Sequence, residues 1–501
     1  MADVKREIER KYEAAPDTRL PDLTGVRNVA AVVDKGAVEL DAVYYDTEDL
    51  RLAAASITLR RRTGGDDAGW HLKLPVAPGV RDELRAPLED DVPRSLAGLV
   101  HARTRGAALV PLVRLRSHRQ VRHLVDAEGA LLAEAATDTV RAERIAGGDG
   151  GTVEWTEIEV ELADGGDPAL LDAVHKRLRK KGLRPAGSAS KLAKALDHTG
   201  WRPPAPPEED STAGGRVLAH LREQAGQLVT YDAAVRRDLP DSVHRMRVAT
   251  RKLRSAFRTY RKILDRRATD PVASELKWLA GELGVDRDQE VLTERLTSRI
   301  DALPVTLLLG PVRGRLRAWA GAGRAGSRGR TLAVLDSERY TALLDALDAL
   351  LADPPLRPAA GKPARAVLPR AVLKDYERLA ARMERALALP AGHDRDVAMH
   401  EARKAAKRVR YAAEAAAPAL GKPAKRLAKR VKAVQKVLGD HQDSVVARDT
   451  LRNLAIQAHA AGETAFTWGL LYGQEEARAA RRERELPEVW ARAVPGKLRR
   501  L

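Results

Sequence analysis

Cysteine, aromatic residues and long apolar runs are scarce or missing in this 501-residue sequence. Without cysteine the chain can form no disulfide and no thiolate metal site. It has only two phenylalanines and therefore little provision for stacking bases, so we expect no sequence-specific nucleic-acid partner. The chain starts on a charged segment and has no run of about 18 apolar residues. We expect a soluble, cytoplasmic protein of several domains with no membrane partner.

The net charge of +18 is located almost entirely in one part of the chain. Residues 1–207 contain 32 Lys and Arg against 33 Asp and Glu, whereas residues 208–501 contain 56 against 37. The two parts therefore differ in net charge, −1 against +19. A basic excess confined to one part predicts a polyanion partner for that part. The alternative is that Arg-rich helices only keep an Ala-rich chain soluble.

The first part contains short segments in which charged and apolar residues alternate, which is typical of β-strands. In Val4–Tyr12 the side chains of Glu7, Glu9 and Lys11 would project from one face. Five further segments repeat the alternation, with Arg60 and Arg62, with Lys73, with Arg81, Glu83 and Arg85, with Arg114 and Arg116 ahead of His118 and Arg119, and with Glu157, Glu159 and Glu161. Six such strands predict a closed antiparallel barrel of about eight strands.

A charged face on the outside of that barrel would need no ligand, but a charged interior would. Cations at Lys11, Arg60, Arg62, Lys73, Arg114 and Arg116 could bind a chain of phosphates. The facing carboxylates Glu7, Glu9, Glu157 and Glu159 could hold Mg²⁺ or Mn²⁺, which bridges phosphate oxygens.

Seven motifs in order make the first part similar to a known family. They are EIERK (7–11), YYDTEDLRL (44–52), TLRRR (58–62), HLKLP (71–75), RLRSHR (114–119), TEIEVEL (156–162) and SASKLAKAL (188–196). With them, residues 1–200 resemble the CYTH domain of the triphosphate tunnel metalloenzymes. The resemblance implies an eight-stranded tunnel that hydrolyses or cyclises a triphosphate.

The resemblance also implies roles for individual residues. The implied metal ligands are Glu7, Glu9, Asp138, Glu157 and Glu159, and the implied phosphate-binding residues are Lys11, Arg60, Arg62, Lys73, Arg114, Arg116, Arg119 and Lys191. A further hypothesis is that Tyr44 or Tyr45, with Lys11, helps to deprotonate the attacking water. Full activity of the Tyr44→Phe and Tyr45→Phe variants would remove it.

The second part, beyond a Pro-rich linker at 201–215, is expected to be all α-helical and internally duplicated. His244, Arg247, Arg251 and Arg254 recur about 155 residues later as His400, Arg403, Lys407 and Arg410. Offsets of 0, 3, 7 and 10 fall within about 80° on a helix, so each set forms one basic stripe. Like charges on one stripe repel one another unless an anion lies across them. We therefore predict an α+β multidomain protein: the barrel domain (1–200), the linker, and a helical domain (216–500) with half-repeats at about 216–350 and 365–500.

The repeated motifs are similar to those of a second family. They are VHRMRVATRKLR (243–254), LGVDRDQEV (283–291), HEARKAAKRVRY (400–411) and LGDHQDSV (438–445). The second part resembles the CHAD domain, a helical domain of two related bundles that often follows a CYTH domain. This resemblance implies binding of inorganic polyphosphate by the paired stripes. The acidic residues of the motifs, Asp286, Asp288, Asp440 and Asp443, either orient the arginines or cap helices.

Together these features favour metal-dependent hydrolysis of inorganic triphosphate or polyphosphate, or of an organic triphosphate, in the tunnel. The basic domain would bind the polyphosphate or tripolyphosphate, which would also allow an association with polyphosphate granules. Three alternatives stay open: a non-catalytic protein that binds or targets polyphosphate, a nucleotide cyclase, and a nucleic-acid-binding protein.

Overall fold

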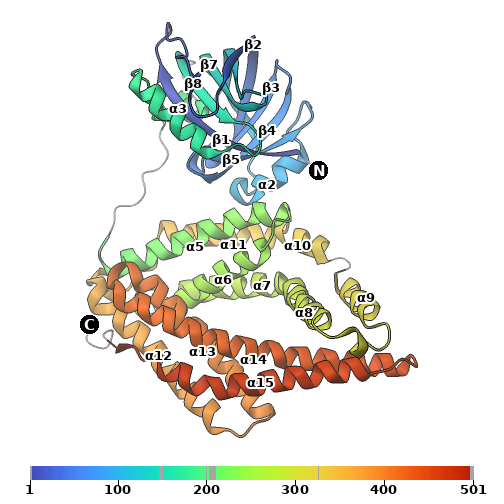
Figure 1. The fold of residues 1–501 in the computed structure, drawn as a ribbon. Helices are drawn as coiled ribbons and strands as arrows, with labels where there is room; N and C mark the ends of the chain where they lie inside the picture. The colour runs from blue at the N-terminus through green and yellow to red at the C-terminus, as the bar shows by residue number, and fades with distance from the viewer. Residues whose placement is uncertain (1–2, 146–150, 199, 202–209, 325–326, 497–501) are drawn as a thin grey trace. The chain divides into compact units, whose positions relative to one another are not determined.

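The computed structural model describes residues 3–145, 151–198, 200–201, 210–324 and 327–496, without the side chains of 3, 285–287, 322–324 and 327. The chain forms two compact units, residues 1–207 and 208–501 (Figure 1). Among the described residues no helix has the length and apolar character needed to cross a bilayer.

Eight strands of the first unit form a closed antiparallel barrel, as the sequence predicted. They are β1 (Asp3–Ala14), β2 (Ala31–Asp46), β3 (Thr58–Thr63), β4 (Gly69–Ala77), β5 (Val80–Ala86), β6 (Val110–Val125), β7 (Leu131–Arg144) and β8 (Thr152–Leu162). Their order is β5-β4-β3-β2-β6-β7-β8-β1, and pairing of β1 with β5 closes the barrel. A two-residue strand, β9 (Arg184–Pro185), extends the sheet beside the end of β1.

Helices cover the barrel in two ways. The apolar face of α3 (Pro168–Lys180) packs on outward-facing residues of the wall such as Tyr12 and Ile158. The apolar face of α4 (Lys191–His198) packs on Ala42, Tyr44 and Leu115, which face the interior. Because of this contact α4 covers one end of the barrel interior. Two other helices, α1 (Arg51–Ala54) and α2 (Arg94–Thr104), lie in connections between strands.

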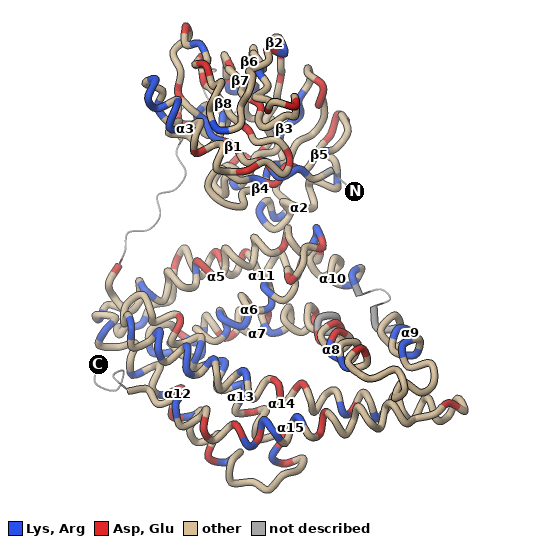
Figure 2. The backbone as a smooth tube through the Cα atoms, in the orientation of Figure 1, with Lys and Arg blue, Asp and Glu red and all other residues tan. Residues whose placement is uncertain are grey.

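The second unit is helical, as the sequence predicted. Its first half contains α5 (Ala213–Arg236), α6 (Ser242–Thr259), α7 (Arg266–Glu282), α8 (Gly284–Asp301), α9 (Val312–Arg324), α10 (Ser327–Leu335) and α11 (Glu338–Ala352). Its second half contains α12 (Ala364–Ala388), α13 (His393–Leu420), α14 (Lys422–Ala460) and α15 (Phe466–Ala491). The stripes lie on α6 and α13, where Lys and Arg recur along the helices (Figure 2).

The two halves differ at the Leu-Gly pair of the repeated motif. In the second half Leu438 and Gly439 lie inside the continuous helix α14, whereas in the first half the chain breaks between α7 and α8 at Leu283. Beyond the break, α8 and α9 share a buried core with α14 and α15, in which Leu296 packs near Leu451. The two halves are therefore separate in sequence but share this core.

Candidate functional site

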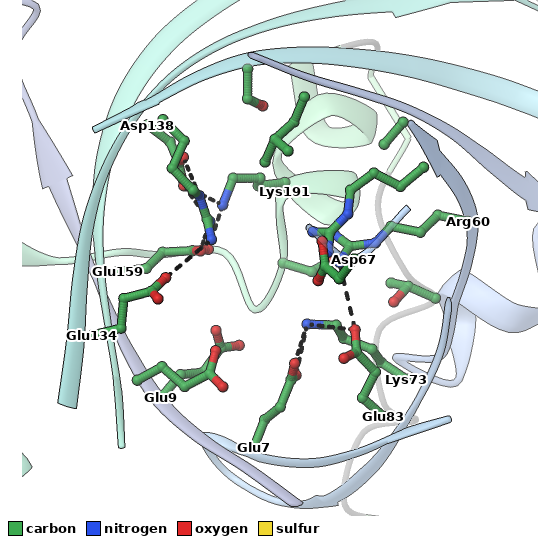
Figure 3. A pocket seen from close by; sticks show the side chains of 18 of the residues that line it. Glu7, Glu9, Arg60, Asp67, Lys73, Glu83, Glu134, Asp138, Glu159 and Lys191 are labelled. Atoms are coloured by element: carbon green, nitrogen blue, oxygen red, sulfur yellow. Dashed lines mark hydrogen bonds and ion pairs between the residues drawn. The ribbon is translucent and has the colours of Figure 1, made fainter. Parts of the chain in front are cut away.

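The barrel interior holds a cavity of about 210 Å³ whose lining is rich in charged side chains of both signs (Figure 3). Of the residues predicted to act here, the cavity is lined by Glu7, Glu9, Lys11, Tyr44, Arg60, Arg62, Lys73, Arg119, Asp138, Glu159 and Lys191. They come from strands β1, β2, β3, β4, β6, β7 and β8 and from the start of α4. Glu157 lies beside this lining, and its carboxylate forms an ion pair with Lys191.

Three buried carboxylates converge at one side of the cavity. Oxygens of Asp138, Glu157 and Glu159 all lie within 4.8 Å of one another. The Lys191 ammonium lies among them, 2.9 Å from Asp138 Oδ2, 2.9 Å from Glu157 Oε1 and 2.5 Å from Glu159 Oε1. Arg119 donates to Asp138 at 2.7 Å and to Glu159 at 2.6 Å. Oxygen donors that already attract several cations fit a hard divalent ion.

Neighbouring cations favour the ionised forms of Asp138 and Glu159 and lower the pKa of each. Burial alone would raise the pKa of Glu159, but the Lys11 and Lys191 ammonium groups outweigh it and the pKa lies well below its usual range. Burial likewise raises the pKa of Asp138, and Lys191 and Arg119 bring it below the usual value. Burial lowers the pKa of Lys191, yet the facing carboxylates raise it above normal. The surroundings of Asp138, Glu159 and Lys191 therefore favour the charged form of each.

The opposite wall carries a second set of ion pairs (Figure 3). Lys73 Nζ lies 2.7 Å from Glu7 Oε2 and 3.5 Å from Glu83 Oε1. Arg60 NH2 lies 3.6 Å from Glu83 Oε1. Burial raises the pKa of Glu7 despite the nearby Lys73. The Lys11 ammonium lies 3.3 Å from Glu9 and also contacts Glu159, so it connects the two walls.

The structure corrects the prediction that Arg114 and Arg116 face the interior. Both project outward and pair with Asp41, and Arg114 Nε donates to Asp41 Oδ1 at 2.9 Å. The pairing of β6 with β7 is regular through this stretch, so Leu115, Ser117 and Arg119 share the inner face. Arg116 and Arg119 are three residues apart and therefore lie on opposite faces of β6. Either Arg114 and Arg116 or Arg119 can line the cavity, but not both.

The two candidate tyrosines also lie on different faces. The Tyr44 hydroxyl lines the cavity and accepts a hydrogen bond from Arg60 NH1 at 3.3 Å. Burial raises the pKa of Tyr44, but Arg60 outweighs it and the pKa is lower than usual. Tyr45 does not line the cavity, and its ring packs against Trp70 with centroids 4.8 Å apart. Of the two tyrosines that the hypothesis named for deprotonating the attacking water, only Tyr44 therefore lines the cavity.

Several charged residues of the cavity were not chosen from the sequence. Glu83 contacts His71 Nδ1 at 2.9 Å and Arg85 at 2.6 Å, and despite its burial its pKa is lowered by Lys73 and His71. Arg81, Glu83 and Arg85 alternate with other residues along one strand, and this alternation could have placed Glu83 in the cavity. Asp67, which pairs with Arg62, lies between β3 and β4 and has no periodic signal. Glu134, on β7, has only apolar neighbours in the sequence, so no alternation of charge marked it as a cavity residue.

The second unit brings the two predicted stripes towards each other. Burial lowers the pKa of Lys407 to about 7, assisted by Arg403 on its own helix and by Arg251 on α6. Burial and Arg247 lower the pKa of Arg251, and Arg403 on α13 adds to the effect. Cations of both halves are therefore close enough to repel one another. Among the remaining stripe residues, His400 Nδ1 lies 2.7 Å from Gln442 Oε1, Arg410 Nε lies 3.3 Å from Glu414 Oε1, His244 is exposed, and Arg254 is partly buried.

The Leu-Gly motifs support the stripe arginines. Arg247 NH1 donates to the Gly284 carbonyl at 3.3 Å and to Asp288 at 3.1 Å. A Cβ atom on Gly284 would lie only 2.9 Å from Arg247 NH2, so glycine leaves room for the guanidinium. In the second half Arg403 lies 3.8 Å from Asp443.

The four acidic residues of the motifs do not all serve the stripes. Asp288 and Asp443 pair with stripe arginines, which agrees with the alternative that the acidic residues orient the arginines. Asp440 instead pairs with Arg295 and Arg482. The side chain of Asp286 lies outside the described residues.

Comparisons with known proteins agree with this division. The CYTH domain family matches residues 5–195 and the CHAD domain family matches residues 219–452. Two uncharacterized proteins of Mycobacterium tuberculosis, from strains CDC 1551 / Oshkosh and H37Rv, are each 41% identical over 517 aligned positions, which cover 99% of this chain and 97% of theirs.

Similar solved structures include PptA from Streptomyces chartreusis, with 20% identity and a TM-score of 0.49 over 56% of this chain and 100% of that chain. Another is a putative adenylyl cyclase from Hippeastrum described as having a dominant triphosphatase activity, with 17% identity and a TM-score of 0.24 over 40% of this chain and 97% of that one.

CYTH domains are metal-dependent triphosphate tunnel enzymes, and CHAD domains are associated with polyphosphate. The order of the two domains and the near full-length similarity place this chain in the family of proteins in which a CYTH domain is followed by a CHAD domain.

Proposed function

We propose that the chain hydrolyses inorganic triphosphate or polyphosphate in the tunnel, with Mg²⁺ or Mn²⁺, and that its helical unit binds the polyphosphate chain. The observation that carries this proposal is one cavity in which Asp138 and Glu159, with the Glu157 carboxylate close beside them, lie opposite Lys73 and Arg60. A pure phosphate-binding site has no need of so many carboxylates, because they repel the ligand.

The carboxylate cluster fits a divalent cation, since its three ligand oxygens are buried and lie close together. When bound, such an ion would neutralise phosphate charge and supply an activated water. Phosphoryl transfer depends mainly on positioning and charge stabilisation, so no protein nucleophile is required.

The cations of the tunnel have separable tasks in this proposal. Lys73, Arg60 and Arg62 bind the phosphates that do not react, because they line one wall together. Arg119 and Lys191 stabilise the charge that develops beside Asp138 and Glu159. The Tyr44 hydroxyl, with Lys11, remains the candidate for helping to deprotonate water, and an unchanged rate in Tyr44→Phe would exclude it.

In the helical unit we propose that polyphosphate lies across the stripes of α6 and α13. The lowered pKa values of Lys407 and Arg251 support this, because clustered cations are relieved by an anion. Repeated phosphates can contact both stripes at once, whereas a single small anion cannot.

The test is phosphate release by the full chain from tripolyphosphate, long polyphosphate, thiamine triphosphate and ATP, with and without Mg²⁺ or Mn²⁺. We expect metal-dependent turnover that the Glu159→Gln variant loses by about 100-fold or more. Metal-independent turnover, or an unaffected variant, would refute the proposal.

Three other results would each favour one alternative. Tight polyphosphate binding without any turnover would favour a non-catalytic binding protein. Conversion of ATP to a cyclic nucleotide would favour a cyclase. A preference for DNA over polyphosphate would favour a nucleic-acid-binding protein, whereas salt-sensitive DNA binding alone would not.

A further inference from the structure

Strand β1 changes its pairing partner beside residues that line the tunnel. Strand β1 pairs with β5 as far as Ile8, and with β9 from Tyr12 onward. Between these pairings Glu9 N donates to the Gly79 carbonyl, and the Lys11 carbonyl accepts from Ala186 N. The β4–β5 turn and the segment before α4 therefore separate beside Glu9 and Lys11.

Two further cavities occupy this region. One, of about 430 Å³, is lined by Glu9 and Lys11 of the tunnel together with Arg81 and Ser188. The other, of about 450 Å³, shares Arg81 and Ser188 with it and shares Ser190 with the tunnel cavity. Both therefore adjoin the tunnel through its side wall, and Arg81 lines both.

Arg81 is a buried cation with no carboxylate at ion-pair distance in the described part of the chain, and the Glu9 carboxylate attracts it only from farther away. It is 8% exposed, and its NH2 group donates to the Ala189 carbonyl at 2.6 Å. The carboxylates that line the two cavities are Glu9 and Asp197, and neither forms an ion pair with Arg81. Glu9 is already paired with Lys11. Burying a guanidinium that has no carboxylate in direct contact is costly, and an anion in the cavity would offset that cost.

The position of α4 explains why an anion site is useful here. Because α4 covers one end of the barrel interior, a phosphate at that end cannot leave along the barrel axis past the helix. The mouth of the tunnel would be occupied by the rest of the substrate. The side opening at Arg81 is the path that adjoins the tunnel without passing either obstacle.

We propose that this side opening, defined by Arg81, Ser188 and Ser190, is a second anion site that takes one tetrahedral phosphoryl group. The group is either the orthophosphate released by hydrolysis or the end of a chain longer than triphosphate. The choice between these sources rests on the proposed function, but the existence of the anion site does not.

The first experiment does not depend on turnover. Crystals of the full chain are soaked in selenate, a tetrahedral oxyanion with anomalous scattering, for the wild type, Arg81→Gln, and the control Arg61→Gln. Arg61 is an arginine whose Nε donates to the Glu89 carbonyl and which does not line these cavities. We expect a selenate peak beside Arg81 in the wild type and in Arg61→Gln, and none in Arg81→Gln. No peak beside Arg81 in the wild type would overturn the proposal.

Kinetics with the full chain then identify the source. If orthophosphate occupies the site, phosphate inhibits tripolyphosphate hydrolysis with a non-competitive component, which Arg81→Gln weakens by about tenfold or more. If a chain end occupies it, Arg81→Gln lowers kcat/KM about tenfold for tetrapolyphosphate and spares tripolyphosphate. Equal small losses on both substrates with an unchanged inhibition pattern would overturn both assignments.

A second variant covers the case in which Arg81→Gln does not fold. Ser188→Trp keeps the guanidinium but fills the opening from the partly exposed segment before α4. It should also remove the selenate peak, and a retained peak would contradict the proposed location. A chain that binds selenate at Arg81 but hydrolyses nothing would refute the proposed function alone.

Discussion

At the residue scale, the two faces of β6 give the sharpest test of the tunnel. Arg119 faces the cavity and contacts Asp138 and Glu159, whereas Arg116 faces outward and is about half exposed. We expect Arg119→Ala to lower kcat/KM for tripolyphosphate by about 100-fold or more, because it removes a preorganised cation from the reacting charge.

The matched control is Arg116→Ala, which should change kcat/KM less than about twofold, since exposed ion pairs contribute little. Both rates come from initial phosphate release at saturating metal. Equal losses in the two variants would mean that the outer face of β6 also takes part.

The strand periodicity predicted much of this site but could not choose the inner face of β6. Glu7, Glu9 and Lys11 were placed correctly because apolar residues on the other parity fixed the face of β1. On β6 both faces carry arginine, so the charge pattern could not predict which face points into the barrel. Only the closed barrel shows that the face of Arg119 is the inner one. Residues between strands, such as Asp67, follow no period and become part of the site only through folding.

At the element scale, α13 carries a cation that should respond to pH. The pKa of Lys407 is lowered to about 7 by burial and by Arg403 and Arg251, so much of the group is neutral at pH 7.5. A bound polyanion favours the protonated form and raises the pKa. Binding should therefore take up a proton, and affinity should fall as pH rises above about 7.

Calorimetry at pH 7.5 in two buffers of different ionisation enthalpy measures this uptake. The control is Lys407→Arg, which keeps the charge but does not titrate, and should bind polyphosphate without that proton. An apparent binding enthalpy that is the same in both buffers for the wild type would contradict the prediction.

The Leu-Gly motifs allow a second test at this scale. Gly439 lies inside α14, where a Cβ would be 3.5 Å from Arg403, an ordinary contact. Gly439→Ala should therefore stabilise the helix by up to about 1 kcal/mol. Gly284→Ala should instead displace Arg247, because its Cβ would come within 2.9 Å of the guanidinium.

Thermal unfolding and polyphosphate titration of both variants separate the two effects. We expect a higher Tm and unchanged affinity for Gly439→Ala, and about several-fold weaker binding for Gly284→Ala, since a charge-assisted hydrogen bond of Arg247 is lost. Equal affinities in the two variants would show that the motif does not position Arg247.

At the scale of the whole molecule, the question is whether the helical unit recruits substrate for the tunnel. The charge difference between the two parts, −1 against +19, indicates that long polyanions meet the helical unit first. A chain held there has a raised effective concentration at a tethered active site, whereas tripolyphosphate is too short to gain from two sites.

The double variant Arg251→Gln with Lys407→Gln should therefore raise KM for long polyphosphate by about tenfold or more and leave tripolyphosphate kinetics unchanged. The control is Arg245→Gln, an exposed arginine of α6 that lies off the stripe. Because the tunnel lies in a separate compact unit, the stripe substitutions should not alter its geometry. Equal losses on the two substrates would instead mean that the helical unit supports the tunnel directly, and recruitment would no longer explain why the two domains share one chain.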